Sequence, residues 1–324
     1  MMPGVVSTPR QNRAFMFHRR SRRAVLLVGA VAAAAVAGCG GGASATSPSG
    51  GPAALRVVAA ENFWGSIATQ LAGRRAQVDS IIVKPGADPH DYQPTAADGR
   101  VLAGAQLAIV NGVGYDTWAS KLLAAEPTSG RQVITVGDLL GLHEGDNPHR
   151  WYSPADVETV ANAITTDLKK LDPGDARYFD AQRTAFETQG LASYHAVISS
   201  IRATYAGVPV GASESIFELL APALGLHLIT PAGYMKAISE GTDPTAGDKQ
   251  TIDQQIARRQ IKVWVYNSQN STPDIARLTK QAEAEHIPVT TITETLTPAT
   301  DSYEQWQTAQ LHRLQAALHR ATGR

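Results

Sequence analysis

The sequence contains a single cysteine, Cys39, and no excess of charge of either sign. One cysteine excludes a disulfide-stapled fold, and if Cys39 is used elsewhere, the folded part has no thiolate to offer a metal. Lysine and arginine number 29, as do aspartate and glutamate, so no basic surface for nucleic acid is expected. There is also no H-E-x-x-H motif and no histidine-rich run. These absences argue against a disulfide scaffold, a nucleic-acid partner and one common class of zinc hydrolase.

Apolar residues near the amino terminus, from Ala24 to Ala37, form a run of about fourteen residues, short for a membrane span of roughly twenty. Arginines precede the run, as in a signal peptide. It ends in Val36-Ala37-Gly38-Cys39, which resembles a bacterial lipobox and implies cleavage before Cys39 and lipid attachment to its sulfur. We expect a signal peptide over 1–38 and a flexible tether rich in Gly, Ser, Ala and Pro over 39–54. Lipidated Cys39 would anchor the protein outside the bacterial cell membrane.

Strand-like and helix-like segments alternate from Leu55 onward, which predicts an α/β fold with parallel sheets covered by helices. A helical pattern over about 175–206 is broken only by Gly190, and some thirty helical residues span about 45 Å. That length suits a strut between domains. We therefore expect two α/β lobes, 55–153 and 207–324. Each should contain a mostly parallel four-stranded sheet flanked by helices, and one long rigid helix within 154–206 should join them.

Two Pro-His motifs stand between a predicted strand and a predicted helix. Asp88-Pro89-His90 precedes a capping-box pattern at 95–98, and Asn147-Pro148-His149 precedes a helix start with Ser153 as N-cap. Open α/β sheets bind ligands beyond the carboxyl ends of their strands, and the prolines stiffen both loops. Two such loops in equivalent settings are hard to explain by packing. His90 and His149 are therefore candidate metal ligands.

Carboxylates that follow predicted strands are the candidate oxygen donors of the second lobe. Residues 215–218 form a capping-box pattern, which predicts a helix over 215–224 and leaves Glu214 without a structural role. Glu294 follows the last strand, where a surface carboxylate is the alternative interpretation. Asn267 follows the central strand and is also explained by a turn. His143 lies in the loop before His149. We expect Asn267 and His143 to support the ligands rather than to bind the ion.

Two imidazoles and two carboxylates suit Zn²⁺, Mn²⁺ or Fe²⁺, and do not suit Cu(I), which prefers sulfur. Two ionised carboxylates would neutralise a divalent ion. Because imidazoles bind metals as neutral bases, the affinity should fall as the pH drops through the range in which histidines take up protons.

The order of these motifs resembles the cluster A-I solute-binding lipoproteins of zinc and manganese ABC importers, the ZnuA/TroA-like family. The resemblance runs from Leu55 onward and is most specific at the paired Pro-His motifs. It implies His90 and His149 as ligands, with Glu214 where the family has His or Glu and Glu294 where it usually has Asp. It further implies a receptor, not an enzyme, that captures zinc or manganese between its lobes and delivers it to a membrane permease and its ATPase. We expect a monomer.

Two other functions are compatible with the same residues. An envelope adhesin or structural lipoprotein could carry the metal site incidentally, and nothing in the sequence excludes it. A metallohydrolase would need an open coordination position and a positioned general base, for which the sequence offers no motif.

Overall fold

The computed structural model describes residues 54–87, 89–270 and 272–324. The expectations for the signal peptide, for Cys39 and for the tether up to residue 53 lie outside these residues. Among the described residues, none of the helices combines the length and apolar character that a membrane crossing requires.

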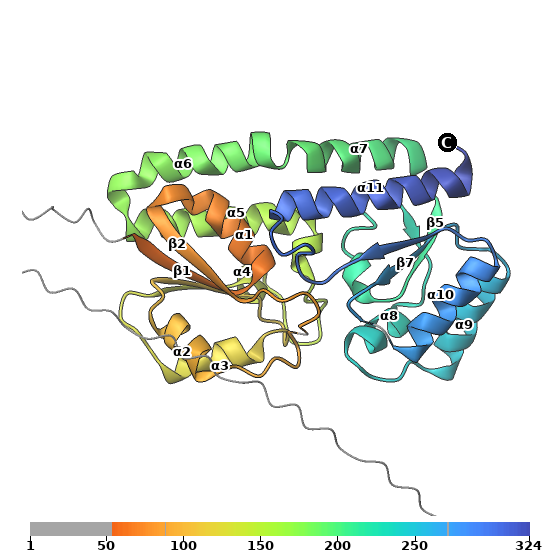
Figure 1. Cartoon of the computed structure of the whole chain (residues 1–324), viewed down its shortest axis with the longest axis horizontal. Helices are drawn as coiled ribbons and strands as arrows, with labels where there is room; N and C mark the ends of the chain where they lie inside the picture. The colour runs from red at the N-terminus through yellow and green to blue at the C-terminus, as the bar shows by residue number, and fades with distance from the viewer. Residues whose placement is uncertain (1–53, 88, 271) are drawn as a thin grey trace, which may run out of the picture. The chain divides into compact units, whose positions relative to one another are not determined.

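Two four-stranded parallel sheets form the framework of the described chain (Figure 1), as the sequence predicted. The first has the strand order β2-β1-β3-β4 and the second the order β6-β5-β7-β8. The first comprises β1 (Leu55–Glu61), β2 (Ala76–Ile82), β3 (Leu107–Val110) and β4 (Gln132–Thr135). The second comprises β5 (Pro209–Ala212), β6 (His227–Leu228), β7 (Trp264–Asn267) and β8 (Val289–Ile292).

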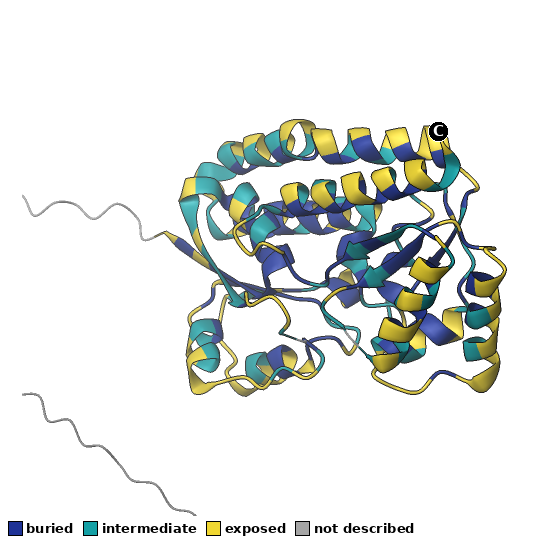
Figure 2. Cartoon of the chain, turned by 45° about the vertical axis from the view of Figure 1, so that its right-hand side comes forward, coloured by how far each residue is buried: buried dark blue, intermediate teal, exposed yellow. Residues whose placement is uncertain are grey.

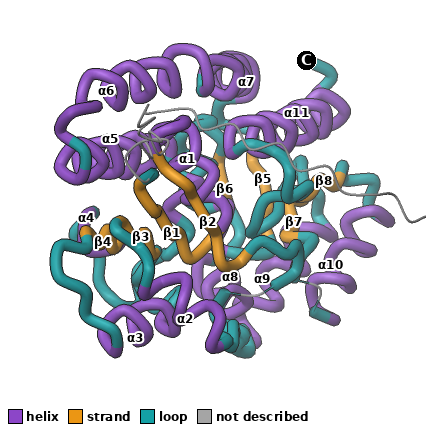
Figure 3. Tube along the Cα trace, turned by 60° about the vertical axis from the view of Figure 1, so that its left-hand side comes forward, coloured by secondary structure: helices purple, strands orange, loops and turns teal. Residues whose placement is uncertain are grey.

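Alternate residues of the first sheet face two different helical layers. Val57 and Ala59 belong to one apolar cluster, with residues of α1 (Asn62–Ala72) and α5 (Pro154–Leu171). Val58 and Ala60 belong to another, with residues of α2 (Ala96–Ala103) and α3 (Thr117–Ala125). Because successive side chains of a strand point to opposite faces, one apolar strand can serve both layers. Figure 3 shows α2 and α3 on the opposite side of this sheet from α1 and α5.

Four α-helices flank the second sheet. They are α8 (Ala232–Ser239), α9 (Ala246–Ala257), α10 (Pro273–Ala284) and α11 (Tyr303–Thr322). The strands of this sheet are largely buried, whereas the outward faces of the helices are exposed (Figure 2). A four-residue helix, α4 (Val136–Leu139), follows β4 in the first lobe.

The long helix that follows the first sheet and precedes the second in the sequence consists of three pieces. These are α6 (Ala176–Ala185), a π-helical turn (Phe186–Gly190) and α7 (Ala192–Tyr205). α6 packs on helices of the first lobe, and α7 packs along α11 of the second. Figure 1 shows α6 and α7 running end to end, so the predicted connecting helix is present. The prediction missed the π turn, which ends at Gly190.

The two lobes share buried contacts on the side of α11. The Tyr152 hydroxyl donates to the Thr293 carbonyl at 2.7 Å, and the Tyr303 hydroxyl donates to the Trp151 carbonyl at 2.6 Å. One contiguous apolar cluster also contains residues of both lobes. These contacts oppose a wide opening of the lobes.

Two expectations for the second lobe are wrong. The segment 215–224 is not an α-helix: it forms a 3₁₀ turn, Ser215–Phe217, followed by further turns. Pro222 explains the difference, because a proline inside a helix removes a hydrogen bond and clashes with the preceding turn. The capping box is also absent, since the Ser215 hydroxyl bonds to Ser239. Conversely, α8 occupies a stretch in which no helix was expected.

Candidate metal site

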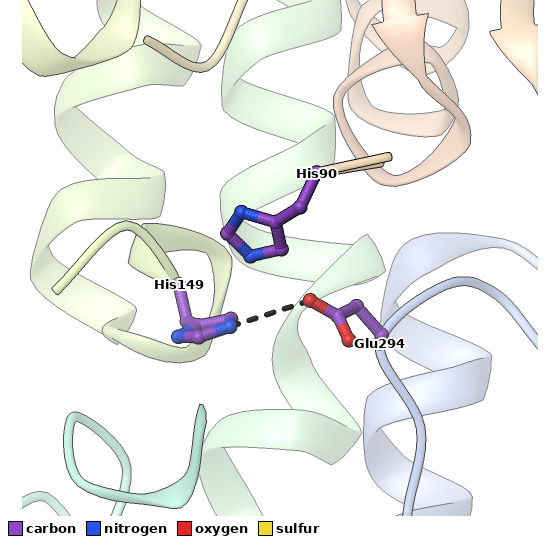
Figure 4. A group of neighbouring side chains, drawn as sticks. All are labelled: His90, His149 and Glu294. Atoms are coloured by element: carbon purple, nitrogen blue, oxygen red, sulfur yellow. Dashed lines mark ion pairs between the residues drawn. The ribbon is translucent and has the colours of Figure 1, made fainter. Parts of the chain in front are cut away.

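His90 and His149 from the first lobe and Glu294 from the second point toward one another (Figure 4). One nitrogen or oxygen atom from each lies within 4.8 Å of the other two. His149 Nε2 is 3.3 Å from Glu294 Oε1, and the two imidazole centroids are 6.5 Å apart. The first lobe thus contributes two nitrogen donors and the second lobe an oxygen donor.

His90 lies in the loop between β2 and α2. The predicted capping box closes this loop: Thr95 N donates to Asp98 Oδ2 at 2.7 Å, and Asp98 N donates to Thr95 Oγ1 at 3.3 Å. The His90 ring packs edge-on against Tyr115, with centroids 4.7 Å apart. The capped start of α2 and the Tyr115 ring therefore orient this imidazole.

His149 is buried and is oriented by Asn147. The Asn147 Oδ1 atom accepts from the backbone N–H of His149 at 3.1 Å and lies 2.8 Å from His149 Nδ1. This contact leaves Nε2 on the side of Glu294. In the form that binds a metal ion, Nδ1 would keep a proton donated to Oδ1, and Nε2 would offer its lone pair to the ion. The Asn147 amide nitrogen donates to Ser215 O at 2.7 Å and to Glu218 Oε2 at 3.0 Å. Asn147 therefore links the orientation of His149 to the second lobe.

Glu294 is held from both sides. The backbone N–H of Glu294 donates to the Gln269 side-chain oxygen at 2.7 Å. The Tyr115 hydroxyl donates to Glu294 Oε1 at 3.1 Å, and the Asn267 amide donates to Glu294 Oε2 at 3.2 Å. Burial by itself would raise the pKa of Glu294. The hydrogen bond and charge of His149, the charge of His90 and the Tyr115 hydroxyl outweigh burial and lower that pKa below its ordinary value. The side chain is thus a carboxylate suited to a cation.

Glu214 is buried next to this group without belonging to it. Its Oε2 accepts from Asn267 Nδ2 at 3.2 Å, the same nitrogen that donates to Glu294. Glu214, Glu294 and His90 line one cavity of about 230 Å³. The two carboxylates therefore lie on either side of a single amide group.

The two residues expected to support the ligands differ in their placement. Asn267 is fully buried and donates to both carboxylates. The His143 side chain is 89% exposed, and its Nδ1 atom lies 4.0 Å from Asp146 Oδ2. The structure does not bring His143 to His90, His149 and Glu294.

Sequence reasoning overlooked Tyr115, Asn147 and Gln269 as part of this site. Tyr115 ends the turn after β3, where its N–H donates to the Gly112 carbonyl at 3.0 Å, and no local pattern marks it as part of a site. Asn147 belongs to the second Pro-His motif, and its position two residues before the histidine was a signal for this role. Gln269 follows β7, and no local pattern distinguishes it from an ordinary turn residue.

Residues 57–317 match the family model described as zinc-uptake complex component A, periplasmic. That match covers most of the chain, and the protein therefore belongs to this family.

Curated relatives are metal-binding proteins by name. The manganese-binding lipoprotein MntA of Halalkalibacterium halodurans is 33% identical over 137 residues, which cover 41% of this chain and 45% of the relative. The iron-binding protein YfeA of Yersinia pestis is 32% identical over 146 residues, 43% of this chain and 47% of the relative. The metal ABC transporter substrate-binding lipoprotein FimA of Streptococcus parasanguinis is 25% identical over 240 residues, 67% and 72% of the two chains. The matched stretch thus spans less than half of the first two relatives.

Solved structures share the fold. The periplasmic zinc-binding protein TroA of Treponema pallidum superimposes with a TM-score of 0.65 at 22% identity, covering 82% of this chain and 99% of its own. A manganese-bound periplasmic metal-binding protein of Candidatus Liberibacter asiaticus gives a TM-score of 0.67 at 21% identity with the same coverage.

Proposed function

We propose that this protein is the solute-binding component of an ABC importer and captures a divalent transition metal, zinc or manganese, between its two lobes. His90, His149 and Glu294 are proposed as ligands, with Glu214 as the fourth. The observation that carries the proposal is the convergence of two imidazoles and one ionised carboxylate from opposite lobes within 4.8 Å of one another.

Glu214 is proposed as a ligand because of its neighbours. It is buried, shares the Asn267 amide with Glu294 and lines the same cavity as His90. Burial of two carboxylates side by side is unfavourable without a compensating positive charge. A divalent ion supplies that charge, so the second carboxylate supports a cation as the cargo.

The donor set limits the choice of metal without reducing it to one. Nitrogen and oxygen donors fit Zn²⁺, Mn²⁺ and Fe²⁺, and the lack of sulfur disfavours Cu(I). Zinc should bind more tightly than manganese at any such site. The relatives include proteins named for manganese and for iron, in a family named for zinc uptake.

A cavity of about 840 Å³ adjoins both histidines and supports a route for the ion. Acidic residues line it, among them Glu144 and Asp146 from the first lobe and Glu218 and Glu240 from the second. Carboxylates along a cleft raise the local concentration of cations.

The remaining parts of the proposal concern location and partners. Lipidated Cys39 would hold the receptor outside the cell membrane, and a permease with its ATPase would accept the ion from a monomeric receptor. The proposal includes no catalytic step. Chelator-sensitive hydrolysis by the purified protein would favour the metallohydrolase instead, and adhesion that survives loss of the ligands would favour the adhesin.

Titration calorimetry with Zn²⁺ and Mn²⁺ tests the ligand assignment. His90→Ala, His149→Ala and Glu294→Ala should each weaken binding by more than the roughly 10–100-fold that loss of a hydrogen bond to a metal ligand costs, because each removes a proposed coordinating atom. His143→Ala is the matched control, since it removes an exposed histidine of the same loop as His149, and it should leave the affinity unchanged. Unchanged binding in His90→Ala or His149→Ala would reject the site.

A further inference from the structure

A second cluster of metal-ligating side chains lies in the helical layer and shares no residue with the site between the lobes. It consists of Glu158 on α5, Glu187 in the π turn and His195 on α7. One ligand atom from each lies within 4.8 Å of the other two. The side chains of Glu187 and His195 are 33% and 35% exposed, so an ion in solution can reach them.

The π turn explains why Glu187 and His195 share a face. In an unbroken α-helix, residues eight apart differ by about 80° around the axis. A π turn contains one extra residue, which reduces this difference to about 20° and places the two side chains on one face. The Leu191 N–H donates to the Phe186 carbonyl at 2.8 Å and closes this turn. His195 Nδ1 consequently approaches Glu187 Oε1 to 3.9 Å.

Arg183 leaves one oxygen of Glu187 for the cluster. Its Nη1 donates to Glu187 Oε2 at 3.1 Å, and its Nε donates to Asn162 Oδ1 at 2.8 Å. Oε1 is the atom that faces His195. Two carboxylates and one guanidinium leave one negative charge with a neutral imidazole, so the cluster attracts a divalent cation less strongly than two carboxylates alone would.

We propose that Glu158, Glu187 and His195 form a second binding site for a divalent transition metal such as Zn²⁺. One imidazole nitrogen and two carboxylate oxygens make three protein ligands, and water would complete a tetrahedral shell. The bound ion would link α5 to α7 across the π turn. Because these side chains are partly exposed and Arg183 competes for Glu187, this site is weaker than the site between the lobes.

Zinc titration in a variant lacking the interlobe histidines isolates this site. The protein with His90→Ala and His149→Ala should still bind one equivalent of Zn²⁺. Adding His195→Ala should weaken that residual binding at least tenfold, and Glu158→Ala should do the same. His312→Ala removes an exposed histidine of α11 and is the matched control, expected to change nothing. Thermal unfolding of each variant without metal checks that the fold is retained.

The outcomes separate this proposal from the proposed function. If the unmutated protein binds two equivalents of Zn²⁺ and His195→Ala removes one of them, both the proposed function and the second site are supported. If it binds one equivalent that His195→Ala removes and that the protein without the interlobe histidines keeps, only the second site is supported. No residual equivalent in the protein without the interlobe histidines, or a residual equivalent indifferent to His195→Ala and Glu158→Ala, would overturn the second site.

Discussion

His149 and Glu294 come from different lobes, and their side chains meet with Nε2 and Oε1 3.3 Å apart. Neither side chain stands alone: Asn147 orients the imidazole, and Gln269, Tyr115 and Asn267 hold the glutamate. The contact is thus set by hydrogen bonds from both lobes, which keep the proposed donor atoms close together. Such preorganisation lowers the ordering cost of binding.

Tyr115→Phe tests the hydroxyl that reaches Glu294 across the lobes. The ring contacts with His90 and Trp151 remain, whereas the hydrogen bond to Glu294 Oε1 is lost. We expect metal affinity to fall about tenfold or more, because hydrogen bonds that orient ligands typically contribute 10–100-fold. Calorimetric titration measures the change. Tyr178→Phe, which loses a hydroxyl on α6, should bind like the unmutated protein, and equal affinities for all three proteins would contradict this role of Tyr115.

Asn147→Ala removes the acceptor that orients His149 and the donors to Ser215 and Glu218. Metal affinity should fall by about 10–100-fold while the fold remains intact. Asn147→Asp keeps an oxygen beside Nδ1, but its second oxygen faces the Ser215 carbonyl and the Glu218 carboxylate, which repel it. The aspartate variant should therefore recover only part of the affinity lost in Asn147→Ala, as measured by competition with a chromogenic chelator. Full affinity in Asn147→Ala would show that the orienting bond is dispensable.

Tyr152→Phe tests the buried contact between the lobes. The substitution leaves the Thr293 carbonyl without its 2.7 Å donor in a site where Tyr152 is fully buried. A lost buried partner costs about 1–3 kcal/mol. Urea unfolding should show this loss as a lower midpoint with an unchanged slope. A midpoint equal to that of the unmutated protein would mean that the contact is replaced by water.

Glu61, the last residue of β1, and Asp116, which follows Tyr115 in the chain, form a buried acidic pair. Burial raises the pKa of Glu61 well above its ordinary value, and the charge and hydrogen bonding of Asp116 raise it further. Burial also raises the pKa of Asp116, against the hydrogen bonds from Gly112 and Asn111 that lower it. The proton on Glu61 is thus kept in the folded state to a higher pH than in the unfolded chain.

The stability supplied by this proton is fully present below the ordinary pKa of a glutamate and is lost as the pH rises through the raised value. The free energy of unfolding should therefore fall toward alkaline pH, at up to about 1.4 kcal/mol per pH unit for one proton. Glu61→Gln keeps the shape and cannot ionise, so above the ordinary pKa of a glutamate its stability should depend less on pH than that of the unmutated protein. Parallel curves of unfolding midpoint against pH for the two proteins would contradict this account.

The β-α alternation predicted the two sheets because strands buried on both faces are continuous apolar runs, as in residues 107–110. The Pro-His motifs predicted that His90 and His149 belong to one site, and the structure brings both next to Glu294. This prediction was possible because the loop, the proline and the following helix start are local features of the sequence. Local patterns were insufficient elsewhere. The 215–218 pattern suggests a capping box, but Ser215 bonds instead to Ser239, which is distant in sequence.

The contacts that hold the site together depend on the tertiary fold. Tyr115 reaches Glu294 over a separation of 179 residues, and Asn147 reaches Ser215 over 68. No periodicity or capping rule connects such positions. The position of Glu214, one amide group away from Glu294, likewise follows from the packing of β5 beside β7 and could not be read from either strand alone.

The most direct measurement is a crystal structure of the zinc-loaded protein with anomalous diffraction recorded at the zinc absorption edge. The account predicts an anomalous peak between the lobes, about 2.0–2.2 Å from His90, His149 and Glu294, with Glu214 as the fourth donor. A zinc-loaded crystal whose anomalous peaks all lie away from His90 and His149 would contradict it.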